Sequence, residues 1–496
     1  MKYVSTRSSE RKVDAAQAIV AGLSHEGGLY VPESFPQFSE NTIGAMAGLT
    51  YAQRAKQVMG AYLTDYTDEE MQACVDEAYT NGRFAGEPAP VKKVQDMHVM
   101  ELWHGPTHAF KDMALQMLPR LMTRAIRKTG VDKQVFILVA TSGDTGKAAL
   151  EGFCDVEGTH VGVFYPVDGV SPAQKLQMVT QEGGNVHVCA VEGNFDDAQT
   201  GVKRIFGDDV FARELEEKGY MLSSANSINW GRLVPQVAYY FSAYAELLKS
   251  GEVKPGEEIN FCVPTGNFGN ILAGYYAKRM GLPVGKLVCA SNANNVLFDF
   301  IEKGVYDANR PFYKTTSPSM DILVSSNLER LLFELCGRNC EQVTQWMQAL
   351  KTGGEYTVGA DMHAHTLENF TAGWVGDEDA LKTIAQVKEA CGYTLDTHTA
   401  VAWKVAQDYR EKTGDKRPMV VVSTASPYKF GRSVLGALIG KDAADKLDEF
   451  ACADELEKVS GLEMPESLRE LRVKPQLHKD VVNPMDMIEE VRGWAK

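Results

Sequence analysis

The chain has 496 residues, of which 44% are hydrophobic and 24% are charged, and these values are typical of a globular protein of two or three domains. Its formal net charge of −15 argues against nucleic acid or an anionic membrane as the main partner, because both are negatively charged. Every apolar run is shorter than the roughly 18 residues that a membrane-spanning helix requires, and no cleavable leader pattern opens the chain. The nine cysteines are scattered, mostly in apolar runs, so we expect free thiols and a cytoplasmic protein.

The first 95 residues have the pattern of a mainly helical accessory domain. A turn-rich segment, His-Glu-Gly-Gly-Leu-Tyr-Val-Pro at 25–32, interrupts the helical spacing, and we interpret His25 as a loop residue. Two prolines and a glycine at 85–90 indicate a domain boundary. Helices are predicted over 15–23, 51–62 and 68–79.

A lysine at an unusual position follows this boundary. Gly105 and Pro106 form a turn, Thr107 is a candidate helix cap, and apolar residues then recur at helical spacing. Lys111 is therefore predicted in the first turn of a helix, where a cation is unfavourable because the helix N-terminus is already partly positive. This segment alone favours a solvated lysine. The alternative is a lysine that loses its charge in chemistry, such as one that carries pyridoxal phosphate (PLP).

From residue 135 onward, nearly continuous apolar runs alternate with polar, glycine-bearing turns and helical segments. This pattern is typical of buried parallel strands and predicts an open α/β sheet divided between two lobes. Ligands of such sheets bind at the carboxyl ends of the strands, where the polar turns lie. The predicted strands are 135–141, 161–165, 186–191, 259–263, 287–290 and 419–423.

The turn Pro-Thr-Gly-Asn-Phe-Gly-Asn at 264–270 lies between a strand and a helix predicted over 271–280. Gly266 and Gly269 allow successive backbone N–H groups to point inward at a helix N-terminus, which favours phosphate binding over an ordinary glycine-rich connection. The chain has neither a Walker loop nor a G-x-G-x-x-G dinucleotide fingerprint.

Three other polar turns each fit two interpretations. Ser-Gly-Asp-Thr at 142–145 suits a substrate carboxylate and equally a helix cap. Asn-Ser-Ile-Asn-Trp-Gly-Arg at 226–232 offers a guanidinium for a phosphate, or is a capped surface turn. Ser-Thr-Ala-Ser at 423–426 offers a hydroxyl to a pyridine nitrogen, or is a capping turn.

A structural metal is not expected. Gly105 and Pro106 prevent the continuous helix on which His104 and His108 would form a two-histidine site. The pairs His363/His365 and Cys336/Cys340 lack a second ligand pair at zinc spacing.

Two later segments complete the chain. Residues 328–392 are expected to be mostly helical, and Asp396 to open a helix that carries His398, which we do not expect to reach the cleft. Residues 441–496 combine dense charge, helical spacing and three prolines, which predicts a strap over the core.

Taken together, the motifs resemble those of the threonine synthase family, in the branch with an extra N-terminal domain that contains a Gly-Leu-Tyr-Val-Pro segment, here at 28–32. The resemblance spans nearly the whole chain. It implies the two α/β lobes of fold-type II PLP enzymes: a core at 96–440 with a smaller, mobile lobe at about 135–250, and an extension at 441–496. The motifs are HGPTHAFKD around Lys111, ATSGDTGKAA at 140–149, GNFDDAQ at 193–199, NSINWGR at 226–232 and TGNFGN at 265–270.

The resemblance also implies a role for each matching residue. Lys111 would hold PLP covalently, Thr424 would face the pyridine nitrogen and Asp144 would lie near the phenolic oxygen, where many relatives have Asn. The cofactor phosphate would be bound by Gly266, Asn267, Phe268, Gly269 and Asn270. The substrate carboxylate would be bound by Ser142, Gly143 and Thr145, and the substrate phosphate by Asn226, Ser227 and Arg232.

The implied reaction converts O-phospho-L-homoserine and water to L-threonine and phosphate, the last step of threonine biosynthesis. The substrate would be a small phosphorylated amino acid, and the enzyme a monomer or homodimer. The alternative is a phospho-lyase of similar sequence that gives 2-oxobutanoate, ammonia and phosphate. A catalytically inactive binding protein on the same fold is disfavoured by the intact Lys111 and TGNFGN motifs.

Overall fold

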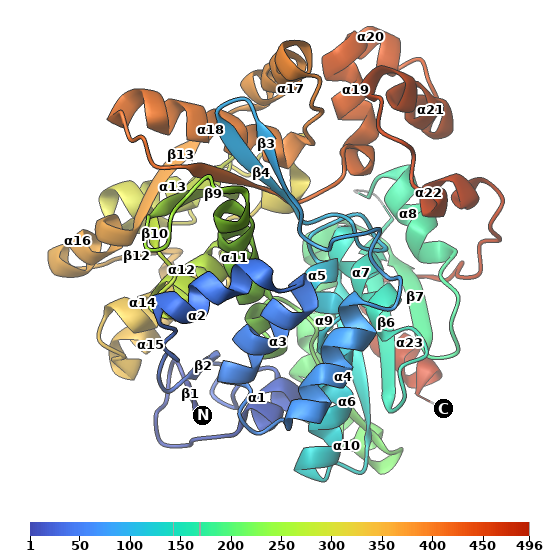
Figure 1. Cartoon of the computed structure of the whole chain (residues 1–496). Coiled ribbons are helices and arrows are strands. Elements are labelled where there is room, and N and C mark those ends of the chain that lie inside the picture. Colours follow the sequence, from blue (N-terminus) through green and yellow to red (C-terminus); the bar gives the residue numbers. More distant parts are fainter. Residues whose placement is uncertain (142, 168–169, 496) are drawn as a thin grey trace.

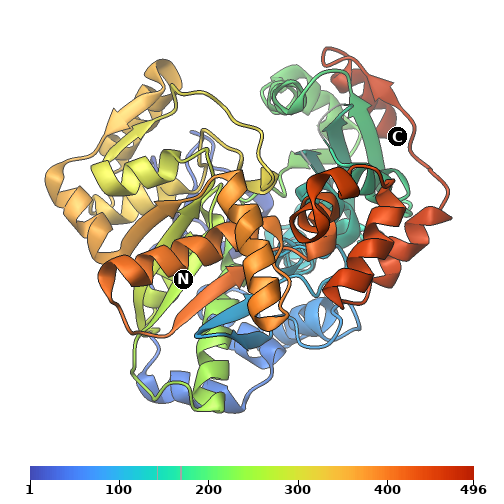
Figure 2. The same ribbon diagram turned by 90° about the horizontal axis from the view of Figure 1, so that it is seen from above.

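The computed structural model describes residues 1–141, 143–167 and 170–495, and its core contains two separate sheets (Figures 1 and 2). The larger sheet has six strands in the order β13-β10-β9-β14-β4-β3, and the smaller has five in the order β15-β7-β6-β5-β8. Only the edge strand β3 runs antiparallel to its neighbour in these two sheets. The strands of the larger sheet are β3 Val91–Val94, β4 Met97–Glu101, β9 Ile259–Pro264, β10 Val284–Ser291, β13 Phe370–Trp374 and β14 Met419–Ser423. Those of the smaller sheet are β5 Gln134–Ala140, β6 Thr159–Pro166, β7 Val186–Val191, β8 Tyr220–Ser223 and β15 Val481–Val482.

All six predicted strands are present, and the predicted division between two lobes is confirmed. The three earlier ones are β5, β6 and β7 of the smaller sheet, and the three later ones are β9, β10 and β14 of the larger sheet. Their interior residues are buried on both faces, which explains why each reads as a continuous apolar run. The remaining strands were not predicted because they are short or carry polar residues.

The N-terminal segment is mainly helical, as predicted, and packs against the core. Its helices are α1 Ala15–Ala21, α2 Glu40–Ala45, α3 Tyr51–Tyr62 and α4 Asp68–Tyr79, joined by a small antiparallel sheet of β1 Tyr3–Ser5 and β2 Tyr30–Pro32. Capping boxes at Thr50 and Thr67 begin α3 and α4. Helix α3 packs on the long core helix α11 (Trp230–Ser250), where the rings of Tyr62 and Trp230 meet at 5.5 Å.

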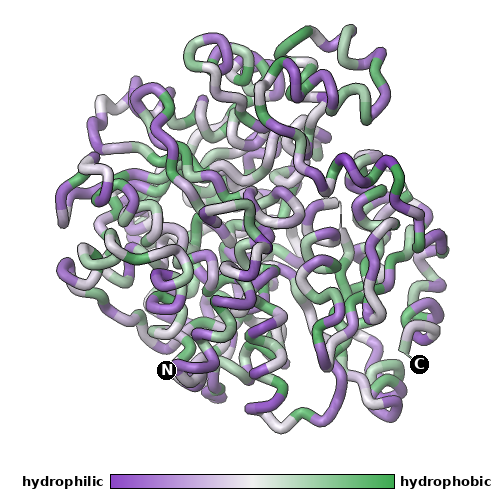
Figure 3. Tube along the Cα trace, turned by 45° about the vertical axis from the view of Figure 1, so that its right-hand side comes forward, coloured by the Kyte–Doolittle hydropathy of each residue, from purple (hydrophilic) through white to green (hydrophobic). Residues whose placement is uncertain are grey.

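Helices cover both sheets, and Figure 3 shows hydrophilic and hydrophobic residues interleaved along the outer helices, as expected for helices that bury one face. No helix within the described ranges is long and apolar enough to span a bilayer. In the first half of the core the helices are α5 Asp112–Leu115, α6 Leu118–Thr129, α7 Asp144–Phe153, α8 Pro172–Val179, α9 Phe195–Phe206, α10 Asp209–Glu217 and α12 Gly269–Arg279. In the second half they are α13 Val296–Lys303, α14 Leu328–Leu335, α15 Cys340–Gly353, α16 Ala360–Asn369, α17 Asp377–Cys391, α18 Thr397–Thr413 and α19 Gly431–Ile439. A two-stranded antiparallel sheet of β11 Val305–Asp307 and β12 Glu355–Thr357 also lies in this half.

The C-terminal segment is the predicted helical strap, and it joins the two lobes (Figure 1). Helix α21 packs on α19 beside the larger sheet, whereas β15 pairs with β7 at the edge of the smaller sheet. The ring of Trp494 then stacks on Phe164 and His187 at centroid distances of 5.0 and 5.2 Å. The helices of the C-terminal segment are α20 Lys441–Ala444, α21 Glu449–Ser460, α22 Glu466–Arg469 and α23 Met487–Trp494.

The close packing of α7 on α5 generates a prediction. A Cβ atom on Gly152 of α7 would lie 2.1 Å from the carbonyl oxygen of Leu115 in α5. Gly152→Ala must therefore push α7 outward, and we expect it to lower the free energy of unfolding by about 1–3 kcal/mol. Chemical denaturation measures the loss. Gly60→Ala in α3 is the matched control: its Cβ would meet no described atom within 4 Å, so it should stabilise by about 0.5–1 kcal/mol. Equal effects from the two substitutions would contradict the packing argument.

Candidate active site

Lys111 is held at the carboxyl end of the larger sheet by its neighbours in the chain. The backbone N–H of Phe110 donates to the carbonyl of Thr424 at 2.8 Å, immediately after β14. The carboxylate of Asp112 accepts hydrogen bonds from the backbone N–H and the hydroxyl of Thr107, both at 2.8 Å. Thr107 therefore braces the turn, and the prediction that it caps the helix is wrong. Lys111 is itself the capping residue of α5, which is only four residues long.

The surroundings of Lys111 favour its neutral form. Burial lowers the pKa of its amine to about 8, with Asp144 acting in the opposite direction and the cations Arg232 and Lys429 adding to the decrease. The unprotonated fraction of the amine near neutral pH is therefore a minority, but a much larger one than in an ordinary lysine. A lysine that is largely surrounded by protein and still partly accessible is suited to covalent chemistry.

The TGNFGN segment has the backbone shape of an anion site. Phe268 adopts a left-handed conformation with φ +64°, and α12 begins at the next residue, which leaves its first N–H groups without helical acceptors. A Cβ atom on Gly266 would lie 2.8 Å from the carbonyl of Ser319, and one on Gly269 would lie 3.4 Å from the Asn327 amide. Any larger residue at Gly266 would therefore clash with the backbone of the neighbouring loop.

Buried donors gather near this helix start without acceptors. The side-chain amide nitrogens of Asn270 and Asn327 are buried and lack acceptors among the described residues. The amide oxygen of Asn270 already accepts from the hydroxyls of Tyr239 and Tyr240, at 2.6 and 2.8 Å, so its nitrogen is fixed in place. Because an unpaired buried donor is costly, this set suits a ligand rich in acceptor oxygens. The phosphate of PLP fits it.

The predicted substrate-carboxylate turn follows β5. The hydroxyl of Thr141 accepts from the backbone N–H groups of Gly143 and Gly146, both at 2.9 Å. Gly143 has φ +143°, and a Cβ atom there would lie 2.4 Å from the Gln174 amide, so the position requires glycine. Thr145 is partly exposed and Ser142 lies outside the described residues.

Asp144 opens α7 and is the negative group of the site. Its carboxylate lies 2.8 Å from the Lys429 amine and accepts from the Gln174 amide at 3.0 Å. Burial opposes ionisation, but Lys429 and Lys111 prevail and lower the pKa of Asp144 to about 2. Asp144 is therefore a carboxylate throughout the physiological range.

The turn at 226–232 places a buried cation near Lys111. Arg232 is 4% exposed, and its guanidinium donates to the carbonyl of Ala225. Its Nε has no acceptor, and no carboxylate lies within ion-pair distance of it, in the described part of the chain. Burial lowers its pKa to about 10, so it remains charged. Asn226 and Ser227 are partly exposed beside it, while Asn229 is the residue that caps α11.

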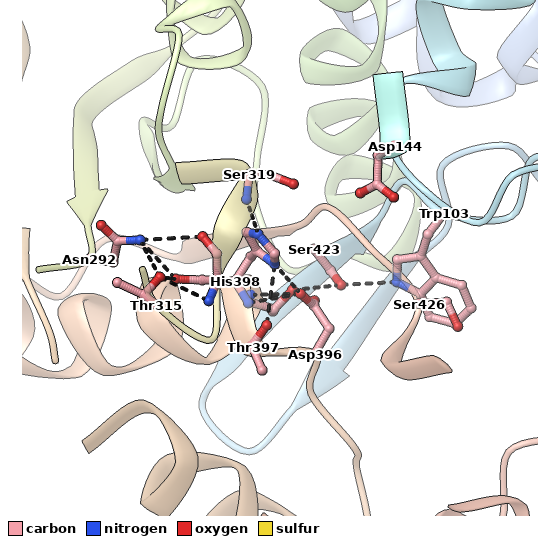
Figure 4. Close-up of polar contacts among 12 residues, drawn as sticks. Trp103, Asp144, Asn292, Thr315, Ser319, Asp396, Thr397, His398, Ser423 and Ser426 are labelled. Carbon is pink, nitrogen blue, oxygen red and sulfur yellow. Dashed lines mark hydrogen bonds and ion pairs between the residues drawn. The ribbon is translucent and has the colours of Figure 1, made fainter. Parts of the chain in front are cut away.

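Thr424 is buried at the end of β14, next to the segment that carries Lys111. The hydroxyl of Ser423 accepts from the indole of Trp103 and from Thr399, both at 3.0 Å (Figure 4). Ser426 caps the following turn, so the capping interpretation is correct for Ser426 and leaves Thr424 available.

His398 supports the site from outside and does not enter it. Asp396 caps α18, as predicted, and lies 3.2 Å from Nδ1 of His398. Nε2 of His398 accepts from the backbone N–H of Ser319 at 3.1 Å, in the loop that packs against Gly266 (Figure 4). Among the residues that the structure describes, no cluster of potential ligands suits a metal ion.

Sequence reasoning missed three residues of this region: Thr141, Asn327 and Lys429. Thr141 belongs to the segment 140–149 that the motifs already single out, whereas Lys429 lies just beyond the Ser-Thr-Ala-Ser turn at 423–426. Asn327 lies in a loop between helices, and no local pattern connects it with α12.

Comparisons with known proteins agree with this geometry. Residues 2–79 match the family model for the threonine synthase N terminus, 85–425 the model for pyridoxal-phosphate dependent enzymes, and 399–491 the model for the threonine synthase C-terminal region. Threonine synthase from Pseudomonas aeruginosa is 41% identical over 447 residues, which cover 90% of this chain and 92% of that one. Threonine synthase from Saccharomyces cerevisiae is 36% identical and covers 93% of both chains. The solved structure of PLP-bound threonine synthase from Brucella melitensis aligns over 100% of both chains with a TM-score of 0.88 and 38% identity.

The position of Lys111 predicts where PLP is attached. Borohydride reduction of the purified yellow protein should fix the phosphopyridoxyl group to Lys111, because its amine has a lowered pKa beside the donor-rich start of α12. Peptide mapping by mass spectrometry measures the site. Lys111→Ala should fold normally and lose nearly all turnover. The control variant Lys147→Ala, which changes a lysine of α7, should retain the label at Lys111. A label on another lysine would contradict the assignment.

Proposed function

The chain belongs to the threonine synthase family of PLP-dependent enzymes, and we propose that it converts O-phospho-L-homoserine and water to L-threonine and phosphate. The observation that carries this proposal is the presence of two sets of donors that suit anions. One is the start of α12 with its two unpaired amides, and the other is Arg232, which has no carboxylate partner in the described ranges. A cofactor phosphate and a substrate phosphate would together satisfy both sets.

The cofactor would be held by the larger lobe. Backbone N–H groups of Gly266, Asn267, Phe268, Gly269 and Asn270 would bind its phosphate, and Lys111 would hold its carbon framework. Thr424 would face the pyridine nitrogen, supported by its position after β14 and beside Phe110. A neutral hydroxyl does not fix a proton on that nitrogen as a carboxylate would. Asp144 would lie near the phenolic oxygen.

The substrate would lie between the two lobes. Its carboxylate would bind the turn formed by Ser142, Gly143 and Thr145, at the start of α7 where the helix dipole favours an anion. Its phosphate would bind Asn226, Ser227 and Arg232, at the start of α11. These turns follow β5 and β8 of the smaller sheet, which supports our proposal that a smaller lobe within about 135–250 closes on the substrate.

When bound, PLP supplies an electron sink for the charge that develops at Cα of the substrate. The amine of Lys111, with a pKa near 8, takes the Cα proton and later returns it. Arg232 would hold the phosphate as negative charge grows on the oxygen that leaves Cγ. Because Arg232 is buried, water screens its attraction for that oxygen little, and the attraction increases as the charge grows. Loss of phosphate from Cγ also requires that a proton leave Cβ, and Cγ must gain a proton to become the methyl group of threonine. Water would then add its hydroxyl at Cβ as Cα regains its proton, and closure of the smaller lobe would limit the access of water to other positions.

The wider expectations remain proposals. We propose an accessory domain at 1–95, a catalytic core at 96–440 and an extension at 441–496. We also propose a cytoplasmic monomer or homodimer without a nucleic-acid partner, which is consistent with nine cysteines that are all free thiols.

The product of the reaction tests the function directly. The purified holoenzyme incubated with O-phospho-L-homoserine should release phosphate and L-threonine in equal amounts, measured by a phosphate assay and chiral chromatography. Release of phosphate with 2-oxobutanoate and ammonia would identify the phospho-lyase instead. No phosphate release would refute both activities.

Arg232 tests how the substrate phosphate is bound. Removal of one charge-assisted hydrogen bond typically costs about 1.5–3 kcal/mol, so Arg232→Ala should lower kcat/KM for O-phospho-L-homoserine by at least about tenfold. Part of the loss should appear in kcat, because the leaving phosphate gains charge. Arg232→Lys should recover only part of the activity, since an ammonium cannot reproduce the two-pronged geometry. The absorbance of bound PLP should not change. Loss of PLP with normal turnover at saturating cofactor would place Arg232 at the cofactor phosphate.

A further inference from the structure

Lys429 is a buried cation to which the proposed function gives no role. It lies in the short turn Pro427–Phe430 after β14 of the larger sheet, and its side chain is 1% exposed. Its amine lies 2.8 Å from the Asp144 carboxylate and donates to the amide oxygen of Gln177 at 3.0 Å. Both partners belong to the smaller lobe, on α7 and α8. A cation from one lobe is thus paired entirely with groups from the other.

Such a pair is poorly explained by stability alone. Removing two charges from water costs several kcal/mol, and a well-packed apolar pair of similar volume is often as stable. The same carboxylate also faces Lys111, whose charge it favours, whereas Lys429 disfavours that charge. Asp144 therefore has two competing cations, and Lys429 has the direct contact.

We infer that Lys429 is a positioning residue of the active site, which anchors the Asp144 carboxylate to the larger lobe and keeps it from pairing with Lys111. Anchoring Asp144 also fixes the start of α7, and with it Gly143 and Thr145, which the proposed function assigns to the substrate carboxylate. The part of this inference that concerns turnover rests on the proposed function. The part that concerns the charge at Lys111 does not.

The charge arrangement gives opposite signs to the two partners. The groups that act on Lys111 are Asp144 from α7, Arg232 from α11 and Lys429 from the turn after β14. In Lys429→Gln a repelling cation is lost and Asp144 becomes free to approach, so the nitrogen of Lys111 should hold its proton to higher pH. In Asp144→Asn the attracting charge is lost, so the proton should leave at lower pH. With both substitutions the two changes oppose each other.

The test is a pH titration of the visible absorbance of the resting holoenzyme, which reports on the charge at the Lys111 nitrogen without any substrate. We expect the midpoint to rise by about one pH unit in Lys429→Gln, to fall in Asp144→Asn and to return close to the wild-type value in the double variant. Lys429→Arg retains the charge and should leave the midpoint nearly unchanged. An unchanged midpoint in Lys429→Gln, or shifts of the same sign in both single variants, would overturn the inference.

Turnover provides the second readout. Lys429→Gln should lose at least about tenfold in kcat/KM, because a buried carboxylate is left without its partner, and the second substitution Asp144→Asn should restore part of that loss. A purely structural role would also couple the two losses, because the residues are in contact, but it would leave the spectral midpoint unchanged.

Lys147→Gln is the matched control. Lys147 is a partly buried cation of α7 that pairs with Glu151 at 3.0 Å and with Gln181, so its contacts remain within the smaller lobe. It should leave the spectral midpoint unchanged and turnover close to that of the wild type. Thermal unfolding of all variants identifies any that fail to fold, and Lys429→Arg then carries the test. Failure of the proposed function would appear separately, as a wild-type holoenzyme that titrates as expected but makes no threonine.

Discussion

The site depends on an excess of buried positive charge where the two lobes meet. Arg232 and Lys429 both act on Lys111, and Asp144 is the carboxylate that acts on Lys111 and Lys429. Buried charges without partners are costly, so this arrangement is stable only if its net positive charge is reduced. The lowered Lys111 pKa of about 8 reduces this charge in part. The buried donors that have no acceptor among the described residues, such as Nε of Arg232, can bind an anion. The proposed phosphate binding and the proposed reactivity of Lys111 thus have the same physical cause.

Segments at both ends of the chain help to fix the positions of these site residues. Arg330 of α14 is fully buried and donates to the carbonyls of Tyr30, in the N-terminal segment, and Ile228, in the turn that precedes Arg232. Its third contact is the amide oxygen of Asn327, which leaves the nitrogen of that amide directed elsewhere. The N-terminal domain therefore takes part in placing both anion sites. At the other end of the chain, β15 and Trp494 connect the strap to the smaller sheet.

The sequence predicts the parts of this structure that depend on local pattern. Continuous apolar runs identify the six central strands because both faces of each are buried, and the turns that follow β5, β9 and β14 were recognised for the same reason. Apolar spacing alone predicts one helix after Lys111, whereas the structure divides it into α5 and α6, and Pro119 at the second position of α6 is the local signal for that break. Lys429 and Asn327 escaped notice because their importance arises only when distant segments meet. Thr107 was misread because its hydroxyl binds Asp112 at short range and not a helix end.

The overall charge of −15 and the positive site are compatible because they act over different distances. At physiological salt, charges on the surface are screened beyond about 8 Å, so the acidic exterior contributes little at a buried point. Inside the protein the effective dielectric constant is lower, and a contact such as the 2.8 Å pair of Lys429 and Asp144 outweighs many surface charges. The acidic surface gives no help in attracting a phosphorylated amino acid from a distance, so association should be slower than for an electrostatically steered enzyme. Under the proposed function, recognition of the substrate then comes from donors that are fixed before it arrives, and Arg232, which is buried and donates to the carbonyl of Ala225, is such a donor.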